Sequence, residues 1–275
     1  MALNLYFATS EVAPFCGAYS LSTFSRKLTT IFNEDPDITV RVVHPKYGFI
    51  SERKYILREV IRLRDLPIIY NGEERIINLK SAFIPESRVQ VYFLQYNSYF
   101  KAVPELLYKS RNGRVLKDND EKYSFFAEVT LSTLKNLYWA PDYMLCNDWQ
   151  CSMIPGLFAQ KYKSDEFYKN IKTIFLLHSL SDSTRYFSTE VFTYLNLEPP
   201  TKNTVQDMLK FAIDNADLVV VVDNEKNELM KKVKADKILK NTLENRNHIV
   251  ATVDQSIPGK WSAVTSTIKA ALQEL

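Results

Sequence analysis

Short apolar runs alternate with longer amphipathic stretches along most of this chain, and this alternation limits the fold more than any other feature of the sequence. The apolar runs are rich in β-branched and aromatic residues, are bounded by turn residues and read as buried strands. Strands that alternate with helices indicate βαβ units around a parallel sheet. We therefore predict an α/β fold, a Rossmann-like parallel sheet with helices on both faces. The expected strands are Leu3–Thr9, Ile38–Val43, Val89–Leu94, Tyr143–Cys146, Lys172–Leu177 and Leu218–Val222. The expected helices are Leu21–Phe32, Glu121–Leu137, Ser152–Tyr162, Val205–Asn215 and Asn224–Val233.

Three further segments complete the predicted organisation. Asn71-Gly72 lies between alternating segments in 55–84 and predicts an antiparallel hairpin with a type I′ turn. The polar segment 101–121 has no clear period and predicts a surface loop. The segment 257–275 carries apolar residues at helical spacing and predicts a final helix that docks on the domain. Because no linker or repeat interrupts the chain, we expect one domain over residues 1–275.

Charge and cysteine content exclude several classes of protein. Lys plus Arg total 35 against 32 Asp plus Glu, and the basic residues are scattered, so no nucleic-acid partner is expected. The first residues lack a basic region and a cleavage site, and no apolar run approaches the roughly 20 residues that span a bilayer. We expect a cytoplasmic protein without a membrane partner. Three cysteines and three histidines show neither a disulfide set nor metal-ligand spacing, and buried thiols are expected at Cys146 and Cys151.

Glycine is scarce, with 6 residues in 275, and the first expected strand-to-helix turn contains only Gly17. The sequence has no G-x-G-x-x-G and no P-loop pattern, which are the usual glycine cradles for dinucleotides and nucleoside triphosphates. We therefore expect no cofactor.

Polar residues follow the expected strands, at the edge where ligands bind in open parallel sheets. These residues are Ser10-Glu11, His44, Asn147-Asp148-Trp149, His178-Ser179 and Asp223. A single pocket that holds all of them is one interpretation. The alternative is that each is an ordinary cap or turn residue, because strand-end loops are polar in most α/β proteins.

The alternatives differ from residue to residue. Asp148 is either a pocket group or a turn or capping carboxylate, and for Asp223 we favour a helix start. His178 is either a hydrogen-bonded core histidine or a pocket group with a titratable nitrogen. Glu11 either accepts hydrogen bonds from ligand hydroxyls or is a solvated turn residue.

Collinear motifs between about residues 3 and 225 resemble the N-terminal half of ADP-glucose-dependent glycogen and bacterial starch synthases. Residues 10–15 match the opening "SEVAPF", and 147–150 resemble "NDWH". The others are 44–48 for "LPRYG", 91–100 for "VYFLDNPEYF", 118–126 for "DNAERFAFF" and 173–180 for "TVFTIHNL", with 215–222 resembling the "AD" strand that ends the family's first domain.

This resemblance implies one of two facing Rossmann domains, the one that contacts the growing glucan while its partner domain holds most of the ADP-glucose. Carried over by position, Glu11, Asp148, Trp149 and His178 would bind substrate on the acceptor side. His178 would lie near the reacting sugar as the candidate catalytic residue. Trp149 either stacks on a sugar ring or is a core residue.

The sequence also departs from the family. The phosphate-facing "KTGGL" turn aligns with Gly17 to Leu21, so the lysine is lost and Tyr19 and Ser20 replace paired glycines. The motifs of the donor-binding domain have no counterpart, so we expect little glucosyl transfer from ADP-glucose by this chain alone. Either it works with a separately encoded donor domain, or it is a non-catalytic α-glucan-binding or regulatory protein of glycogen metabolism. The expected partner is α-glucan or maltooligosaccharide, with ADP-glucose bound at most weakly. A third alternative is a structural protein that forms homodimers.

Overall fold

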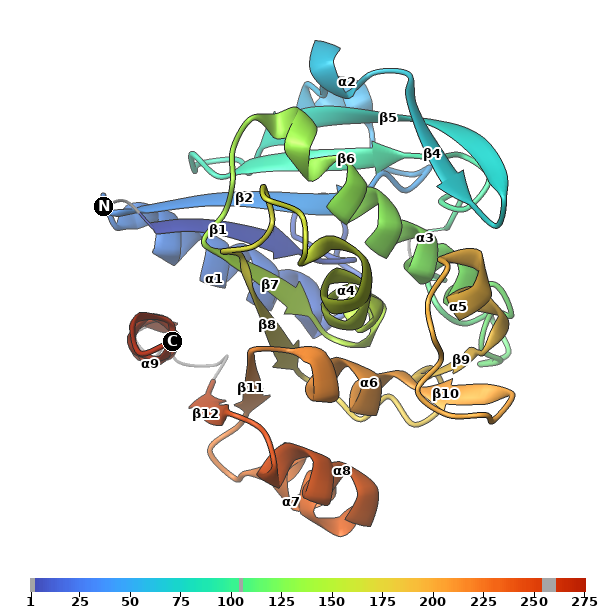
Figure 1. The fold of residues 1–275 in the computed structure, drawn as a ribbon. Coiled ribbons are helices and arrows are strands. Elements are labelled where there is room, and N and C mark those ends of the chain that lie inside the picture. Colours follow the sequence, from blue (N-terminus) through green and yellow to red (C-terminus); the bar gives the residue numbers. More distant parts are fainter. Residues whose placement is uncertain (1–2, 104–105, 254–260) are drawn as a thin grey trace.

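A computed structural model describes residues 3–103, 106–253 and 261–275 and shows a ten-stranded mixed sheet (Figure 1). Its strand order is β12-β11-β8-β7-β1-β2-β6-β5-β3, with β4 beside β5. Neighbours from β12 to β6 are parallel, whereas β3, β4 and β6 are antiparallel to β5. The strands of the sheet are β1 (Leu3–Ala8), β2 (Ile38–Pro45), β3 (Arg58–Glu59), β4 (Leu66–Tyr70), β5 (Glu73–Phe83), β6 (Gln90–Gln95), β7 (Tyr143–Asn147), β8 (Lys172–Leu177), β11 (Leu218–Asp223) and β12 (His248–Thr252).

Helices cover both faces of this sheet, as predicted. Along the strand order of the sheet, the chain runs one way from β1 to β2 and the opposite way from β7 through β8 to β11. Right-handed crossovers therefore put α1 on one face of the sheet and α4 and α6 on the other. Helix α9 packs against α1, while α3 packs against α4 (Figure 1). The helices are α1 (Ser20–Glu34), α2 (Glu52–Tyr55), α3 (Asn119–Ser132), α4 (Met153–Leu157), α5 (Glu190–Tyr194), α6 (Met208–Asn215), α7 (Glu228–Ala235), α8 (Lys237–Glu244) and α9 (Trp261–Gln273). Short 3₁₀ or π turns are η1 (Ile61–Leu63), η2 (Leu134–Leu137), η3 (Trp149–Cys151) and η4 (Phe158–Tyr162).

Apolar periodicity explains both kinds of element. All six residues of β11 are buried, as expected for a strand covered on both faces. Helix α1 instead buries one stripe that includes Leu21, Phe24, Leu28 and Phe32. One hydrophobic cluster runs through the described chain from β1 to Leu272 of α9. The predicted docking of the final helix is confirmed from Trp261 onward. Residues 257–260 of the predicted segment lie outside the described part.

The predicted hairpin is confirmed, and its turn has the expected backbone. Asn71 and Gly72 have φ values of 54° and 71°, the positive angles that a type I′ turn requires at both central positions. All six expected strands form within one or two residues of their predicted bounds. Cys16, Cys146 and Cys151 are buried free thiols.

Some local predictions were wrong. The segment Val205–Asp207 is strand β10, paired with β9 (Tyr186–Ser188), and the helix expected there begins only after it. Asp207 stops the strand because its side chain caps α6 at Leu209 N and Lys210 N. Helix α7 begins at Glu228 and not at Asn224. Strand β12 was not predicted.

Among the residues that the structure describes, no helix is long and apolar enough to cross a membrane. The same residues contain no cluster of three or more His, Cys, Asp or Glu side chains arranged to hold a metal ion.

Candidate functional site

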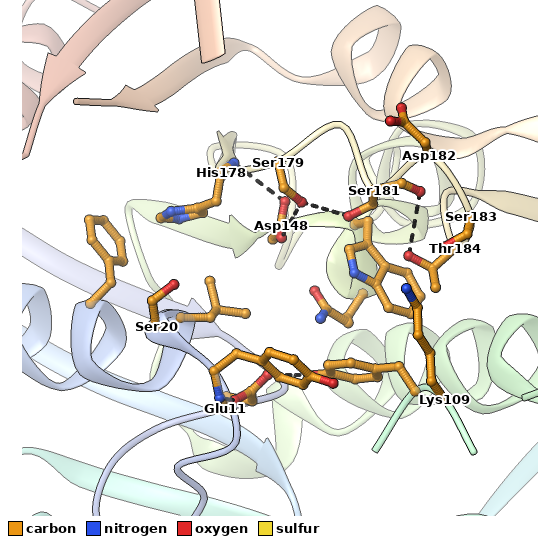
Figure 2. A pocket seen from close by; sticks show the side chains of 16 residues that line it. Glu11, Ser20, Lys109, Asp148, His178, Ser179, Ser181, Asp182, Ser183 and Thr184 are labelled. Carbon is orange, nitrogen blue, oxygen red and sulfur yellow. Dashed lines mark hydrogen bonds between the residues drawn. The ribbon is translucent and has the colours of Figure 1, made fainter. Parts of the chain in front are cut away.

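A cleft of about 600 Å³ opens at the carboxyl ends of β1, β7 and β8, where ligands bind in open α/β sheets (Figure 2). The turn before α1 forms one side, and the loop after β8 forms another. Figure 2 shows Glu11 and Lys109 across the space from His178 and Ser179. The lining residues are Glu11, Tyr19, Ser20, Leu21, Phe24, Tyr108, Lys109, Asp148, Trp149, Gln150, His178, Ser179, Ser181, Asp182, Ser183 and Thr184.

Asp148 follows β7 in a backbone conformation that is unusual for any residue except glycine. Its φ is 60° and its ψ is −171°, a region that costs on the order of 1–3 kcal/mol for a residue with a Cβ. Hydrogen bonds hold it there: the N–H of Asp148 donates to the carbonyl of Leu176 at 2.9 Å, and the N–H of Cys151 donates to the carbonyl of Asp148 at 3.0 Å. Strain of this kind is often found at functional sites.

The strained backbone turns the Asp148 carboxylate toward the loop after β8. Oδ1 accepts the N–H of His178 at 3.3 Å, and Oδ2 accepts the hydroxyl of Ser179 at 3.2 Å. The side chain makes no N-cap hydrogen bond to η3, although the backbone of Trp149 also stabilises the carboxylate. Burial raises the pKa of Asp148 from 3.8 to about 7, although these hydrogen bonds favour the charged form.

His178 is both hydrogen-bonded and part of the cleft wall, so the structure combines the two alternatives. Its Nε2 lies 2.7 Å from Oδ1 of Asn147. Because Asn147 donates through Nδ2 to Thr9 and Ser25, its Oδ1 must accept from the histidine. Nε2 therefore carries the proton, and Nδ1 is left as an acceptor. Burial lowers the pKa of His178 to about 3, so the ring is neutral at physiological pH.

Glu11 is fully buried beneath the cleft and is committed to internal hydrogen bonds. Oε2 accepts the backbone N–H of Tyr19 at 2.9 Å, and Oε1 accepts the hydroxyl of Tyr108 at 2.7 Å. Burial raises the pKa of this carboxyl, while the two hydrogen bonds act in the opposite direction. The structure does not show the alternative of a solvated turn residue for Glu11.

Trp149 touches the cleft but is only 4% exposed. Three aromatic rings meet it edge-on, those of Tyr108, Tyr123 and Phe187, with centroids 5.2 to 6.3 Å away. Both observations favour the core interpretation of this residue, because a sugar ring could not cover the face of a side chain so fully enclosed.

Four predicted members, Ser10, His44, Asn147 and Asp223, are not among the residues that line this cleft. Ser10 and Asn147 are fully buried, and they are hydrogen-bonded to Tyr108 and to His178, respectively. His44 is fully buried against the rings of Tyr47 and Phe93, because β2 continues to Pro45 and places His44 inside the strand instead of after it. Asp223 lines a smaller adjoining cavity of about 360 Å³. Its carboxylate accepts the N–H groups of Leu229 and Met230 at 2.9 and 2.7 Å, which is the predicted role at a helix start.

Other lining residues were not predicted. Tyr108 and Lys109 come from the segment expected to be an irregular loop, and nothing in their local sequence marks them. The hydroxyls of Ser181, Ser183 and Thr184 come from the loop after β8, of which only His178 and Ser179 were predicted. The serine-rich run that follows His178 is the signal that sequence reasoning passed over.

The charge of the lining favours a neutral, hydroxyl-rich ligand over an anion. Among the described lining residues, Lys109 is the one cation, against the carboxyl groups of Glu11, Asp148 and Asp182. The aromatic side chains and serine hydroxyls supply apolar surface together with donors and acceptors, the usual composition of a small-ligand site.

Comparison with known proteins identifies the fold. Residues 4–244 match the family described as the starch synthase catalytic domain. The chain belongs to this family. A glycogen synthase from Pelodictyon phaeoclathratiforme is 34% identical over 177 residues, which are 64% of this chain and 36% of that protein. A glycogen synthase from Chlorobaculum tepidum is 27% identical over 229 residues, which are 80% of this chain and 46% of that protein.

The solved structures agree with the family match. The catalytic domain of starch synthase IV from Arabidopsis thaliana, bound to ADP and acarbose, superposes with a TM-score of 0.71 at 17% identity, over 90% of this chain and 51% of that one. The family match confirms the resemblance predicted from the motifs, and the superposition confirms the predicted α/β fold. This chain spans between about a third and a half of the curated relatives it matches.

Proposed function

We propose that this member of the starch synthase family binds an α-1,4-linked glucan, such as a maltooligosaccharide, in the cleft at the carboxyl ends of β1, β7 and β8. The observation that carries the proposal is the constellation of Asp148, His178 and Ser179, whose polar atoms border a cleft poor in positive charge. The related starch synthase IV structure holds acarbose, an oligosaccharide analogue, together with ADP.

The polar groups suit sugar hydroxyls. Asp148 supplies carboxylate oxygens, and His178 offers the acceptor Nδ1 because its Nε2 proton is engaged by Asn147. Serine and threonine hydroxyls of the loop after β8 can both donate and accept. Each hydroxyl of a sugar can both donate and accept a hydrogen bond. A neutral sugar can therefore bond to the polar groups of this cleft without a compensating charge.

Transfer of glucose from ADP-glucose needs more than this cleft supplies. The leaving diphosphate requires cations or aligned dipoles where its negative charge develops. Within the described lining only Lys109 carries a positive charge. We propose that any transferase activity relies on cations from a donor-binding domain, in the same or a separate polypeptide, and that ADP-glucose binds this region weakly. In such an active site His178 would face the reacting sugar.

A non-catalytic glucan-binding or regulatory role is the second candidate. The observation that favours it is Tyr19, which is 46% exposed in the cleft at the start of α1, where the family has small residues. A bulky ring there leaves less room for a diphosphate at the helix N-terminus, a common anion site.

Calorimetric titration with maltoheptaose and, separately, with ADP-glucose tests the proposal. We expect binding of maltoheptaose by the wild-type chain, at least tenfold weaker binding by His178→Ala, and little heat from ADP-glucose. The matched control is His248→Ala, which removes a partly buried histidine from β12, outside the cleft.

Absence of maltoheptaose binding would contradict the glucan proposal. Equal weakening by His178→Ala and His248→Ala would place the ligand elsewhere. Tight ADP-glucose binding by the isolated chain would contradict the account of the donor side and favour a complete transferase.

A further inference from the structure

Tyr19 occupies the position just before α1 and projects an aromatic ring into the cleft. Its backbone N–H donates to Oε2 of Glu11 at 2.9 Å. The N-terminus of a helix attracts anions because its first N–H groups lack partners. Here the buried Glu11 carboxyl accepts the N–H of the residue just before the first turn, so it fixes the Tyr19 backbone and places an acidic group beside the helix N-terminus.

The ring of Tyr19 also has a packing partner. It stacks on Tyr108, with centroids 5.5 Å apart and an interplanar angle of 22°. Tyr108 is itself only 6% exposed, and its hydroxyl donates to Glu11. One carboxylate therefore positions both rings of the stack, and the Tyr19 side chain remains 46% exposed.

The exposed ring faces a cleft whose other wall is rich in hydroxyl groups. Ser179 and Ser181 are hydrogen-bonded to each other at 2.6 Å, and Ser179 is bonded to Asp148. A pyranose ring has C–H groups on its faces and hydroxyls around its edge. An aromatic surface on one side and polar groups on the other match that distribution, since an aromatic ring buries apolar area at little entropic cost.

We propose that Tyr19 is the sugar-stacking residue of this cleft and makes it select an uncharged pyranose over an anionic ligand. This inference rests on the glucan binding proposed above. The stack of Tyr19 on Tyr108 contacts the face of one glucose unit, while the loop after β8 binds its hydroxyls. The carboxyl group of Asp182, and those of Glu11 and Asp148 when they are ionised, oppose a phosphate in the same space.

Two variants of Tyr19 test the stacking. Tyr19→Ala removes the ring and is expected to raise the Kd for maltoheptaose at least tenfold. Tyr19→Phe keeps the ring and is expected to change the Kd less than threefold. The control is Tyr138→Ala, which removes a tyrosine that is 85% exposed and does not line this cleft, and its Kd should equal that of the wild type.

Proton NMR of the bound sugar supplies a readout that general destabilisation would not mimic. A pyranose proton over the Tyr19 ring should shift upfield, and this shift should persist in Tyr19→Phe and disappear in Tyr19→Ala. Titration with ADP should give no heat with the wild-type chain.

The outcomes separate the two proposals. A wild-type chain that binds maltoheptaose while Tyr19→Ala binds it equally well overturns the role of Tyr19 alone. A wild-type chain that binds ADP more tightly than maltoheptaose overturns the selection of a neutral ligand. Failure of the wild type to bind maltoheptaose overturns both the stacking inference and the proposed function.

Discussion

Replacement of Asp148 by asparagine is expected to change how stability depends on pH, because this carboxyl is buried without a cationic partner among its described contacts. Its pKa rises from 3.8 to about 7 on folding. Between these pH values the native protein holds a proton that the unfolded chain has released. The free energy of unfolding therefore falls as the pH increases from about 4 to 7, and the loss is complete above pH 7.

The size of this effect follows from the change in pKa. At 1.36 kcal/mol for each pH unit, a rise from 3.8 to about 7 corresponds to about 4 kcal/mol. The amide that replaces the carboxyl has no proton to lose, so Asp148→Asn should gain stability relative to the wild type as the pH rises. Asparagine can keep one of the hydrogen bonds, because its Oδ1 still accepts the His178 N–H. The backbone strain at this position is the same for both side chains and cancels in the comparison.

His178 makes the comparison with the variant necessary. Its pKa falls to about 3 on folding, so the unfolded chain binds the extra proton and His178 adds stability as the pH rises toward 6.5. The two residues therefore oppose one another in the wild type. His178 and Glu11 are present in both the wild type and Asp148→Asn. Their contributions to the pH dependence of the unfolding free energy therefore largely cancel when the two proteins are compared.

Urea unfolding at pH 4.5 and pH 8 measures this difference. We expect Asp148→Asn to be more stable relative to the wild type by about 2–4 kcal/mol at the higher pH than at the lower one. Parallel stability profiles for the two proteins would refute the assignment of a raised pKa to Asp148.

Three further predictions test the packing and the charge of the site. Gly156→Ala would place its Cβ 2.1 Å from the Phe211 ring; thermal unfolding should reveal a loss of about 1–3 kcal/mol, and an unchanged Tm would refute the packing of α4 on α6. Trp261→Ala removes a buried side chain whose ring centroid lies 5.9 Å from that of Phe24, and the Phe24 ring centroid lies 4.3 Å from that of His178. Urea unfolding should show a loss of stability of about 3 kcal/mol or more, and maltoheptaose binding should weaken. A loss below about 1 kcal/mol would mean that α9 is not docked as described. Maltoheptaose affinity should change less than about twofold between roughly 50 and 500 mM salt because the ligand is neutral, and a steep salt dependence would argue for an anionic ligand.

Much of the sheet was predictable because its strands carry strong local signals. The buried run in β11 and the Asn71-Gly72 turn each specify their structure through neighbouring residues alone. Strand β12 was missed because it is short and mostly part-exposed at the edge of the sheet. Its formation depends on parallel pairing with β11, which no local pattern reports.

The site was only partly predictable for a similar reason. Glu11, Asp148 and His178 follow strands that the sequence reveals, and the topology brings them to one cleft. Tyr108 reaches Glu11 across 97 residues of sequence, and the strained backbone of Asp148 depends on partners in β8. His44 shows the converse error, because a strand longer by two residues than predicted moved it from the edge into the core.

A crystal structure of this chain with maltoheptaose tests the central claim most directly. We predict a glucose unit in the cleft between the Tyr19 ring and the loop that carries Ser179 and Ser181, with a sugar hydroxyl within hydrogen-bonding distance of Asp148 or His178. Sugar bound only at another surface, or an empty cleft at a maltoheptaose concentration that saturates binding in solution, would contradict the account.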